Sequence, residues 1–216
     1  MVSGSLEGKV ALVTGASRGI GRAVAEALIA EGIQVAVCAL RAAPEVPGAA
    51  FAKRCDISDE VEVRALFAEA GRCDCVVLNA GVLERAPIED FTAAQWDRVL
   101  GVNLRGAFLC AREAFRTGAT RIVGIGSVSG TLGTAHAAAY NASKWGLTGL
   151  VKSLAEEGRG RGIFCAAVLP GAVDTEMLKQ TPFPPRMRPQ EVARVVKFLC
   201  TDAPFAMTGT AVEVFG

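Results

Sequence analysis

Residues 9–30, KVALVTGASRGIGRAVAEALIA, decide the fold of this chain. Residues 9–14 form a short apolar run with several β-branched side chains, and a glycine-rich turn follows at residues 15–21. Residues 22–30 have a helical pattern that ends before Gly32, and residues 33–39 predict a second strand. A strand, a glycine turn, a helix and a second strand in this order are typical of the opening of a doubly wound α/β sheet.

Strands and helices alternate along the rest of the chain. We expect a mostly parallel Rossmann-type sheet of about seven strands, with helices on both faces, in a single domain over residues 1–216. Only ten residues, 40–49, separate the second strand from the third, and two of them are proline. The helix that normally joins parallel strands is therefore expected to be missing there. Further strands are expected at residues 50–54, 74–78, 121–125, 164–169 and 211–215, and helices after Asp59, from about Thr92, and at 100–116, 140–157 and 189–200.

The composition excludes several classes of protein. The chain has 216 residues, which fits one domain with a sizeable core, and its formal net charge of +1 argues against nucleic-acid binding. No apolar run reaches the ~18 residues of a membrane span, and no leader peptide is visible. The seven cysteines have no zinc-ligand spacing, so we expect buried free thiols, no metal site and a cytoplasmic protein.

The turn at residues 15–21 follows the pattern T-G-x-x-x-G-x-G, counted from Thr14. Glycines let the backbone approach a pyrophosphate, and a helix N-terminus adds unpaired N–H groups and a positive dipole end. Such a turn can also serve only to pack a helix on a strand. Its place between a strand and a helix favours nucleotide binding.

Tyr140, the one tyrosine of the chain, precedes Lys144 by four residues on a predicted helix, so both side chains share a face. An ammonium ~4 Å from the phenol, at an effective dielectric constant of ~20, contributes on the order of 4 kcal/mol. That would lower the tyrosine pKa from its usual ~10 by up to roughly three units, giving an acid/base group near neutral pH. The alternative is a lysine that merely packs beside an aromatic ring. Ser127 follows a predicted strand, at the edge where open sheets bind ligands, which favours the chemical interpretation.

Taken together, the motifs resemble the short-chain dehydrogenase/reductase family, and in particular its 3-oxoacyl-[acyl carrier protein] reductase-like members. The resemblance implies an oxidoreductase that transfers a hydride between a nicotinamide and a carbonyl or secondary alcohol, and a 3-oxoacyl thioester is one candidate substrate. The matching motifs, in chain order, are TGASRGIG at 14–21, NAG at 79–81, VNLRG at 102–106, GSVSG at 126–130, Y-x-x-x-K at 140–144 and PGAVDT at 170–175.

The resemblance also implies roles for individual residues. Tyr140 would be the acid/base and Ser127 would orient the substrate oxygen. Lys144 would lower the tyrosine pKa and hold the nicotinamide ribose, and Asn103 would keep a water in a proton relay. Residues 176–188 would form a short substrate lid. Cofactor contacts are implied at Gly15, Ser17, Arg18, Gly19, Ile20, Gly21, Arg41, Asp56, Ile57, Asn79, Ala80, Gly81, Tyr140, Lys144, Pro170, Gly171, Val173 and Thr175.

The end of the second strand bears on the choice of cofactor. NAD-preferring members of the family carry an acidic residue there, whereas this chain has Ala39, Leu40 and Arg41. Guanidinium groups grip phosphate in a fork, so Arg18 and Arg41 favour NADP(H) over NAD(H). A homodimer or homotetramer is implied by the resemblance, and no membrane partner is expected. A non-catalytic NADP-binding sensor or scaffold, an NAD-dependent alcohol dehydrogenase, and an epimerase or dehydratase remain alternatives, because a fold does not fix a substrate.

Overall fold

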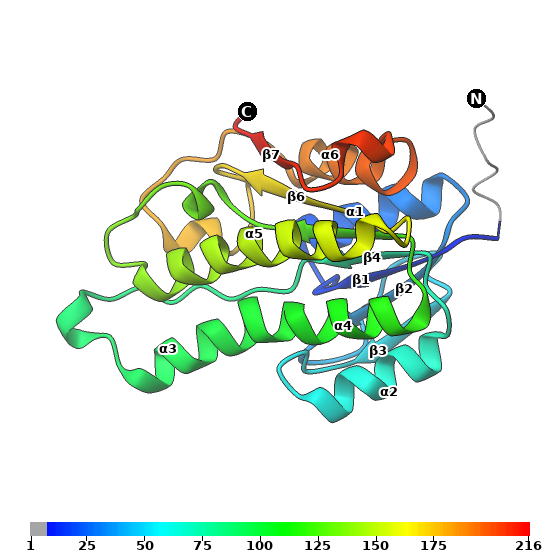
Figure 1. Cartoon of the computed structure of the whole chain (residues 1–216). Helices are drawn as coiled ribbons and strands as arrows, with labels where there is room; N and C mark the ends of the chain where they lie inside the picture. Colours follow the sequence, from blue (N-terminus) through cyan, green and yellow to red (C-terminus); the bar gives the residue numbers. More distant parts are fainter. Residues whose placement is uncertain (1–7) are drawn as a thin grey trace.

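Seven parallel strands form one sheet through the middle of the molecule, and helices cover both of its faces (Figure 1). The computed structural model describes residues 8–216. The strand order is β3-β2-β1-β4-β5-β6-β7, and each neighbouring pair is parallel. The predicted doubly wound sheet is therefore confirmed. The strands are β1 (Val10–Thr14), β2 (Gln34–Ala39), β3 (Phe51–Arg54), β4 (Cys75–Leu78), β5 (Arg121–Ile125), β6 (Phe164–Pro170) and β7 (Ala211–Val214).

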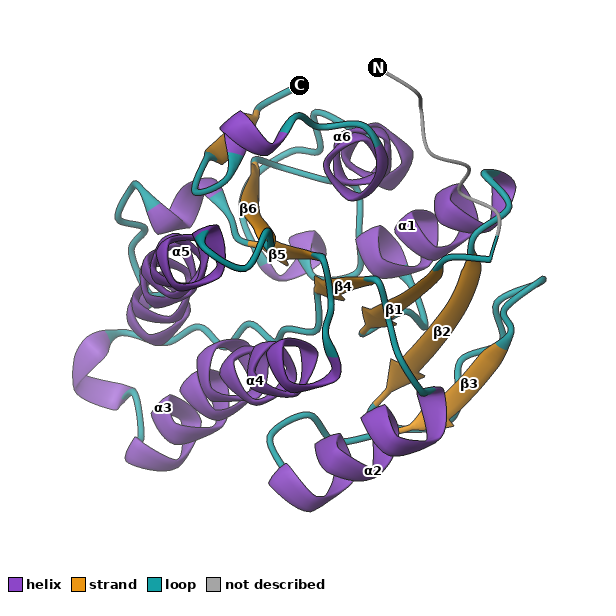
Figure 2. Ribbon diagram, turned by 45° about the vertical axis from the view of Figure 1, so that its right-hand side comes forward, coloured by secondary structure: helices purple, strands orange, loops and turns teal. Residues whose placement is uncertain are grey.

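The two faces of the sheet have separate hydrophobic cores (Figure 2). Alternate residues of β1 enter different cores: Val13 packs with the helices of one face and Leu12 with those of the other. Because both faces are covered, the central strands are continuous apolar runs and not alternating ones. One face carries α1 (Gly19–Ala30) and α6 (Pro189–Thr201); the other carries α2 (Glu60–Ala70), α4 (Ala107–Thr117) and α5 (Ala138–Arg159).

Helix α1 begins at Gly19, three residues before the predicted start at Arg22. Arg18 is its N-cap residue in an extended conformation, and no side chain caps the first turn. Part of the glycine turn is therefore the first turn of the helix, and its N–H groups are left facing the carboxyl end of the sheet.

No helix joins β2 to β3, as the ten-residue spacing predicts. A loop replaces it, and within this loop Val46 is buried against the same core as α1. Gly48 lies so close to α1 that a Cβ placed there would be 3.0 Å from Ile29. The loop thus covers part of the surface that a helix would otherwise bury.

The helix expected at residues 100–116 is not a separate element. Instead, α3 (Ala93–Leu100) continues through a π-helical segment (Gly101–Gly106) into α4. The continuous stretch starts at Thr92, where a reciprocal capping box with Gln95 satisfies the first N–H groups. The π-helical segment widens the turn that holds Asn103, which is fully buried.

Two valines on α2 give a matched test of this packing. Val63 is completely buried in the core beneath α2, whereas the side chain of Val61 is 76% exposed. We expect Val63→Ala to lower the free energy of unfolding by about 1.5–3 kcal/mol, because it removes buried methyl groups. Val61→Ala should change it by less than about 0.5 kcal/mol. Urea unfolding of both variants measures the difference, and equal effects would contradict the assigned faces of α2.

Candidate active site

The glycine turn makes a cradle that side chains would fill. Gly15 and Gly19 have φ values of 67° and 58°, a region that favours glycine. A Cβ on Gly15 would lie 2.7 Å from the Cα of Ala80, and one on Gly21 would collide with the amide of Asn79. Gly15 and Gly21 are therefore required by the close approach of the turn to the end of β4, whereas Gly19 is required by its positive φ and lies against Thr175.

Thr14 ties the turn to β4. Its hydroxyl accepts hydrogen bonds from the backbone N–H groups of Asn79 (3.0 Å) and Ala80 (3.1 Å) and donates to the carbonyl of Val77 (3.2 Å). The Asn79 side-chain amide donates in return to the carbonyls of Thr14 (2.8 Å) and Gly15 (3.1 Å). Thr14 was not among the predicted site residues, although it opens the glycine motif.

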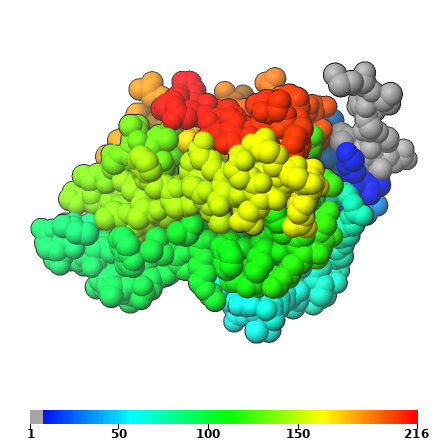
Figure 3. Space-filling view, in the orientation of Figure 1, coloured from blue at the N-terminus to red at the C-terminus, as the bar shows by residue number. Residues whose placement is uncertain are grey.

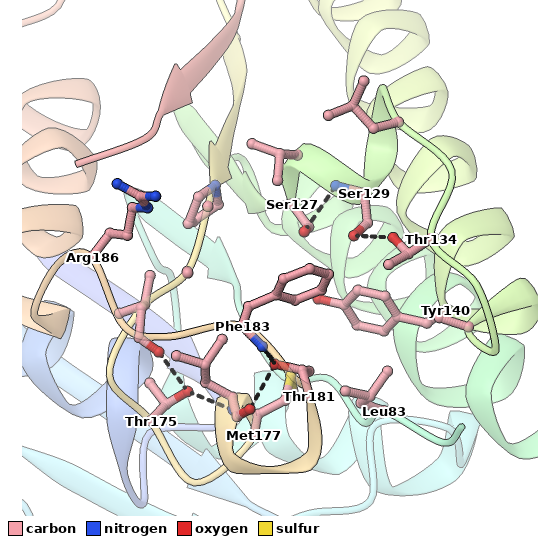
Figure 4. A pocket seen from close by; sticks show the side chains of 18 of the residues that line it. Leu83, Ser127, Ser129, Thr134, Tyr140, Thr175, Met177, Thr181, Phe183 and Arg186 are labelled. Carbon is pink, nitrogen blue, oxygen red and sulfur yellow. Dashed lines mark hydrogen bonds between the residues drawn. The ribbon is translucent and has the colours of Figure 1, made fainter. Parts of the chain in front are cut away.

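Ser127 and Tyr140 meet at one cavity of about 430 Å³ (Figure 4). Ser127 directly follows β5, and its hydroxyl accepts a hydrogen bond from the N–H of Ser129 (3.1 Å), which leaves the hydroxyl proton free to donate. Tyr140 lies in the first turn of α5. The predicted cofactor contacts that also line this cavity are Ile20, Pro170, Gly171, Val173 and Thr175.

Lys144 is buried one turn beyond Tyr140, and its ammonium donates to the carbonyl of Ile125 (2.8 Å). The distance from its Nζ to the centre of the Tyr140 ring is 5.6 Å. Burial lowers the pKa of Lys144 to about 8. Burial also raises the pKa of Tyr140, and a hydrogen bond with Ser127 only partly opposes this. The sequence predicts that Lys144 lowers the pKa of Tyr140, and the structure gives the opposite direction. The reason is that the ammonium is bonded to the carbonyl of Ile125 and both side chains are desolvated.

Asn103 connects this site to the loop after β4. Its side-chain oxygen accepts from the N–H of Val82 (2.8 Å), and its amide donates to the carbonyl of Val82 (2.9 Å) and to the hydroxyl of Ser143 (3.0 Å). Ser143 in turn donates to the carbonyl of Tyr140 (2.7 Å). Asn103 therefore fixes the backbone that carries Tyr140. Ser143, which is fully buried, was missed because a lone helical serine has no motif to mark it.

The outer end of the cradle carries the residues predicted for the adenosine. Asp56 accepts from the N–H and hydroxyl of Ser58, and Ile57 is buried against Gly106. Arg18 and Arg41 are both exposed.

Arg54 is a cation at this outer end that sequence analysis missed. It pairs with Ala39 across the β2–β3 ladder, donates to the carbonyl of Leu40 (3.3 Å) and forms an ion pair with Glu62. Strand pairing alone brings it there, so the sequence held no signal for it.

The sequence predicts neither a metal site nor a membrane span. Within residues 8–216 no group of three or more metal-ligating side chains comes together, and the seven cysteines are all buried and free. No helix in this part of the chain has the length and apolar character required to cross a bilayer.

Comparison with known proteins identifies the family. The sequence model of the family described as short chain dehydrogenase matches residues 9–183. The chain belongs to the short-chain dehydrogenase family. Its curated relatives include the cis-4-hydroxycyclohexanecarboxylate dehydrogenase of Sinomonas cyclohexanicum, 34% identical with 96% of this chain and 95% of the relative covered. Another is the 3-oxoacyl-[acyl-carrier-protein] reductase FabG of Salmonella typhimurium, 35% identical with 98% of each chain covered.

Solved structures agree with this assignment. The 3-ketoacyl-(acyl-carrier-protein) reductase of Brucella melitensis, in complex with NADH, has a TM-score of 0.90 at 31% identity over 98% of each chain. A short-chain dehydrogenase/reductase of Mycobacterium marinum has a TM-score of 0.89 at 31% identity, with 98% of this chain and 96% of the other covered. The chain is therefore an enzyme of this family, whose members use a nicotinamide cofactor and act on alcohols and ketones.

The residues of the cradle fit such a cofactor. The uncapped N-terminus of α1 offers N–H groups to a pyrophosphate, and the three glycines leave open the space that side chains would fill. At the other end of the site, Pro170–Thr175 follows β6 beside Ser127 and Tyr140. Residues 176–188, the expected lid of this short-chain dehydrogenase, are anchored near their end, where Met187 bridges to Val173, and contain a 3₁₀ turn at Leu178–Gln180. Met177, Leu178 and Phe183 of this segment line the cavity.

The role of Thr14 can be tested without changing its shape. Thr14→Val keeps the side-chain volume but leaves the N–H of Ala80 without its partner, while the N–H of Asn79 and the carbonyl of Val77 keep only the hydrogen bond to each other (3.1 Å). A buried group left unpaired costs about 1–3 kcal/mol, so we expect the free energy of unfolding to fall by about that amount. Thr14→Ser retains the hydroxyl and is the control. Equal urea midpoints for the two variants would show that this network does not hold the turn.

Proposed function

We propose that the chain is an NADP(H)-dependent oxidoreductase that interconverts a ketone and a secondary alcohol, with Tyr140 as its acid/base. The observation that carries the proposal is the meeting of Ser127 and Tyr140 in one cavity with the Pro170–Thr175 segment. A non-catalytic sensor has no need to keep these groups together.

The side chains present suit the reductive direction. When bound, a reduced nicotinamide supplies the hydride that adds to the carbonyl carbon. Ser127 donates a hydrogen bond to the carbonyl oxygen, and Tyr140 donates its phenol proton to the same oxygen. Because burial raises the pKa of Tyr140, the phenol holds its proton at neutral pH, as an acid must. In the reverse direction Tyr140 takes the proton back.

Lys144 and Asn103 have supporting roles in the proposed reaction. We assign to Lys144 the binding of the nicotinamide ribose, with an ammonium whose pKa of about 8 keeps it largely protonated at neutral pH. We assign to Asn103 a positioning role: its amide donates to Ser143, which donates to the backbone carbonyl of Tyr140, so Asn103 helps to hold the proton donor in place.

The choice of NADP(H) rests on charge. The end of β2 carries no acidic side chain, and Arg18 and Arg41 are exposed beside the cradle. NAD(H) is the alternative cofactor. Arg54, a third cation near the end of β2, is already paired with Glu62 and so adds little to the binding of a 2′-phosphate.

Arg18→Gln tests the choice of cofactor. We expect the Kd for NADPH to rise tenfold or more, about 1.4 kcal/mol, and that for NADH to change less than twofold, since only NADPH carries the 2′-phosphate. Arg22→Gln removes an arginine of the same helix that pairs with Glu26, and is the matched control. Fluorescence titration gives both constants. Wild-type protein that binds NADH alone would refute the NADP(H) assignment.

We further propose a cytoplasmic homo-oligomer. Helices α4 and α5 lie side by side on one face of the molecule (Figure 3). Large apolar side chains are exposed there, among them Phe108 (43%) and Trp145 (55%). A second copy of the chain would bury them, which supports assembly through these two helices.

Tyr140→Phe tests the mechanism. Removing the phenol oxygen deletes the acid/base and should lower kcat at least about 100-fold, the usual scale of general acid–base catalysis. The measurement is NADPH oxidation with a panel of cyclic ketones and neutral 3-oxoacyl thioesters, after cofactor binding to the variant has been confirmed by titration. A variant that reduces ketones at the wild-type rate would exclude Tyr140 as the proton donor.

A further inference from the structure

The charge of the cavity differs from that of the chain as a whole. The chain has a formal net charge of only +1. Among the described residues that line the cavity, two are charged, Arg85 and Arg186, and neither is matched by a carboxylate in the lining. The other lining residues are mostly apolar or carry a hydroxyl group. An apolar cavity with two cations and no anion is suited to a ligand that carries a negative charge.

Arg186 is fixed at its backbone. Its N–H donates to the carbonyl of Ala172 (2.8 Å), and the next residue, Met187, bridges to Val173. Gly216 packs on the other side, so closely that a Cβ there would lie 2.9 Å from the Arg186 carbonyl oxygen. Arg186 therefore stands on an anchored segment beside the loop that follows β6. It lies on the other side of the cavity from Tyr140 (Figure 4).

The guanidinium of Arg186 has no ion pair or side-chain hydrogen bond with residues 8–216. Two acidic side chains nearby in the sequence have other partners. Glu176 pairs with Lys179, and Glu191 accepts from the backbone of Arg188. A guanidinium has five donors and no acceptor, so all of those of Arg186 are available to a ligand.

Arg85 is the second cation. One of its nitrogens donates to the carbonyl of Ala135 (3.0 Å), which ties the loop after β4 to the loop before Tyr140. Its acidic neighbour Glu84 pairs with Arg98 and not with Arg85. Arg85 adds positive potential to the cavity, but part of its hydrogen-bonding capacity is already used.

The size and walls of the cavity limit the rest of the ligand. The cavity volume of about 430 Å³ is at the low end for ligand sites. In the proposed function the cofactor would occupy the part of the cavity beside Thr175, so the substrate would have only the remainder. Leu83, Leu132, Met177 and Phe183 offer apolar contacts around the remainder. The space therefore suits a compact hydrocarbon body.

We propose that the substrate is a compact oxo or hydroxy acid, whose carboxylate binds Arg186 while its carbonyl or hydroxyl group lies at Ser127 and Tyr140. This inference rests on the proposed function, because it concerns the same cavity. Arginine recognises carboxylate with two parallel hydrogen bonds, so Arg186 would orient the substrate as well as attract it.

Matched probes test the proposal by turnover. With the preferred cofactor, we expect kcat/KM for 4-oxocyclohexanecarboxylate to exceed that for 4-oxocyclohexanecarboxamide at least tenfold. Arg186→Gln should remove this preference, mainly by raising KM for the acid; Arg186→Lys should recover part of it. Arg188→Gln removes the same charge from an exposed residue outside the cavity and should keep the preference. Equal rates for acid and amide in the wild type, or a neutral 3-oxoacyl thioester preferred and indifferent to Arg186→Gln, would overturn the proposal.

Binding without turnover separates this inference from the proposed function. The protein loaded with its preferred nucleotide is titrated calorimetrically with cyclohexanecarboxylate and with cyclohexanecarboxamide, at low and at high salt. We expect the carboxylate to bind at least tenfold more tightly, with a preference that Arg186→Gln abolishes and that salt weakens. Carboxylate binding that depends on Arg186, in a protein that reduces no ketone, would refute the proposed function and keep the anion site. Ketone reduction without any carboxylate preference would keep the proposed function and refute the anion site.

Discussion

The close approach of the glycine turn to the end of β4 is the constraint on which the rest of the structure depends. Gly15 and Gly21 lie so near Asn79 and Ala80 that a methyl group would not fit. The buried hydroxyl of Thr14 holds the two segments together with three hydrogen bonds. This contact aims the first turn of α1 at the carboxyl edge of the sheet. Because β4 and β5 are neighbours, it also sets the distance between the cofactor cradle and Ser127.

Burial governs the electrostatics of Lys144 and Tyr140. It lowers the pKa of Lys144 and raises that of Tyr140, so the phenol comes to hold its proton more tightly than the ammonium does. Neither shift comes from the other group, since the lysine is occupied with the carbonyl of Ile125. A buried lysine at this position is costly unless it is hydrogen-bonded, and the carbonyl at the end of β5 supplies that bond. The position of the ammonium therefore depends on where β5 ends.

The two sides of the cavity are built differently. One wall consists of the segment after β5 and the first turn of α5, where Asn103 and Ser143 fix the backbone of Tyr140. The other is the loop after β6, which Arg186 and Met187 pin by hydrogen bonds to Ala172. The segment that carries Tyr140 and the segment that carries Arg186 are therefore held in place by separate sets of hydrogen bonds. The loop that replaces a helix between β2 and β3 lies away from both walls, at the β3 edge of the sheet.

The sequence by itself determined the parallel sheet and the absent helix before β3, because hydrophobic periodicity and loop length are local properties. It placed the start of α1 three residues late, since a glycine turn and a helix N-terminus look alike in sequence. Tertiary structure alone decided what depends on contacts between distant segments. Strand pairing brought Arg54 to the end of β2, packing of α5 buried Ser143, and the path of the chain after β6 carried Arg186 to the cavity. It also reversed the expected tyrosine pKa shift, because desolvation depends on the whole surroundings of a group and not on the spacing of two residues.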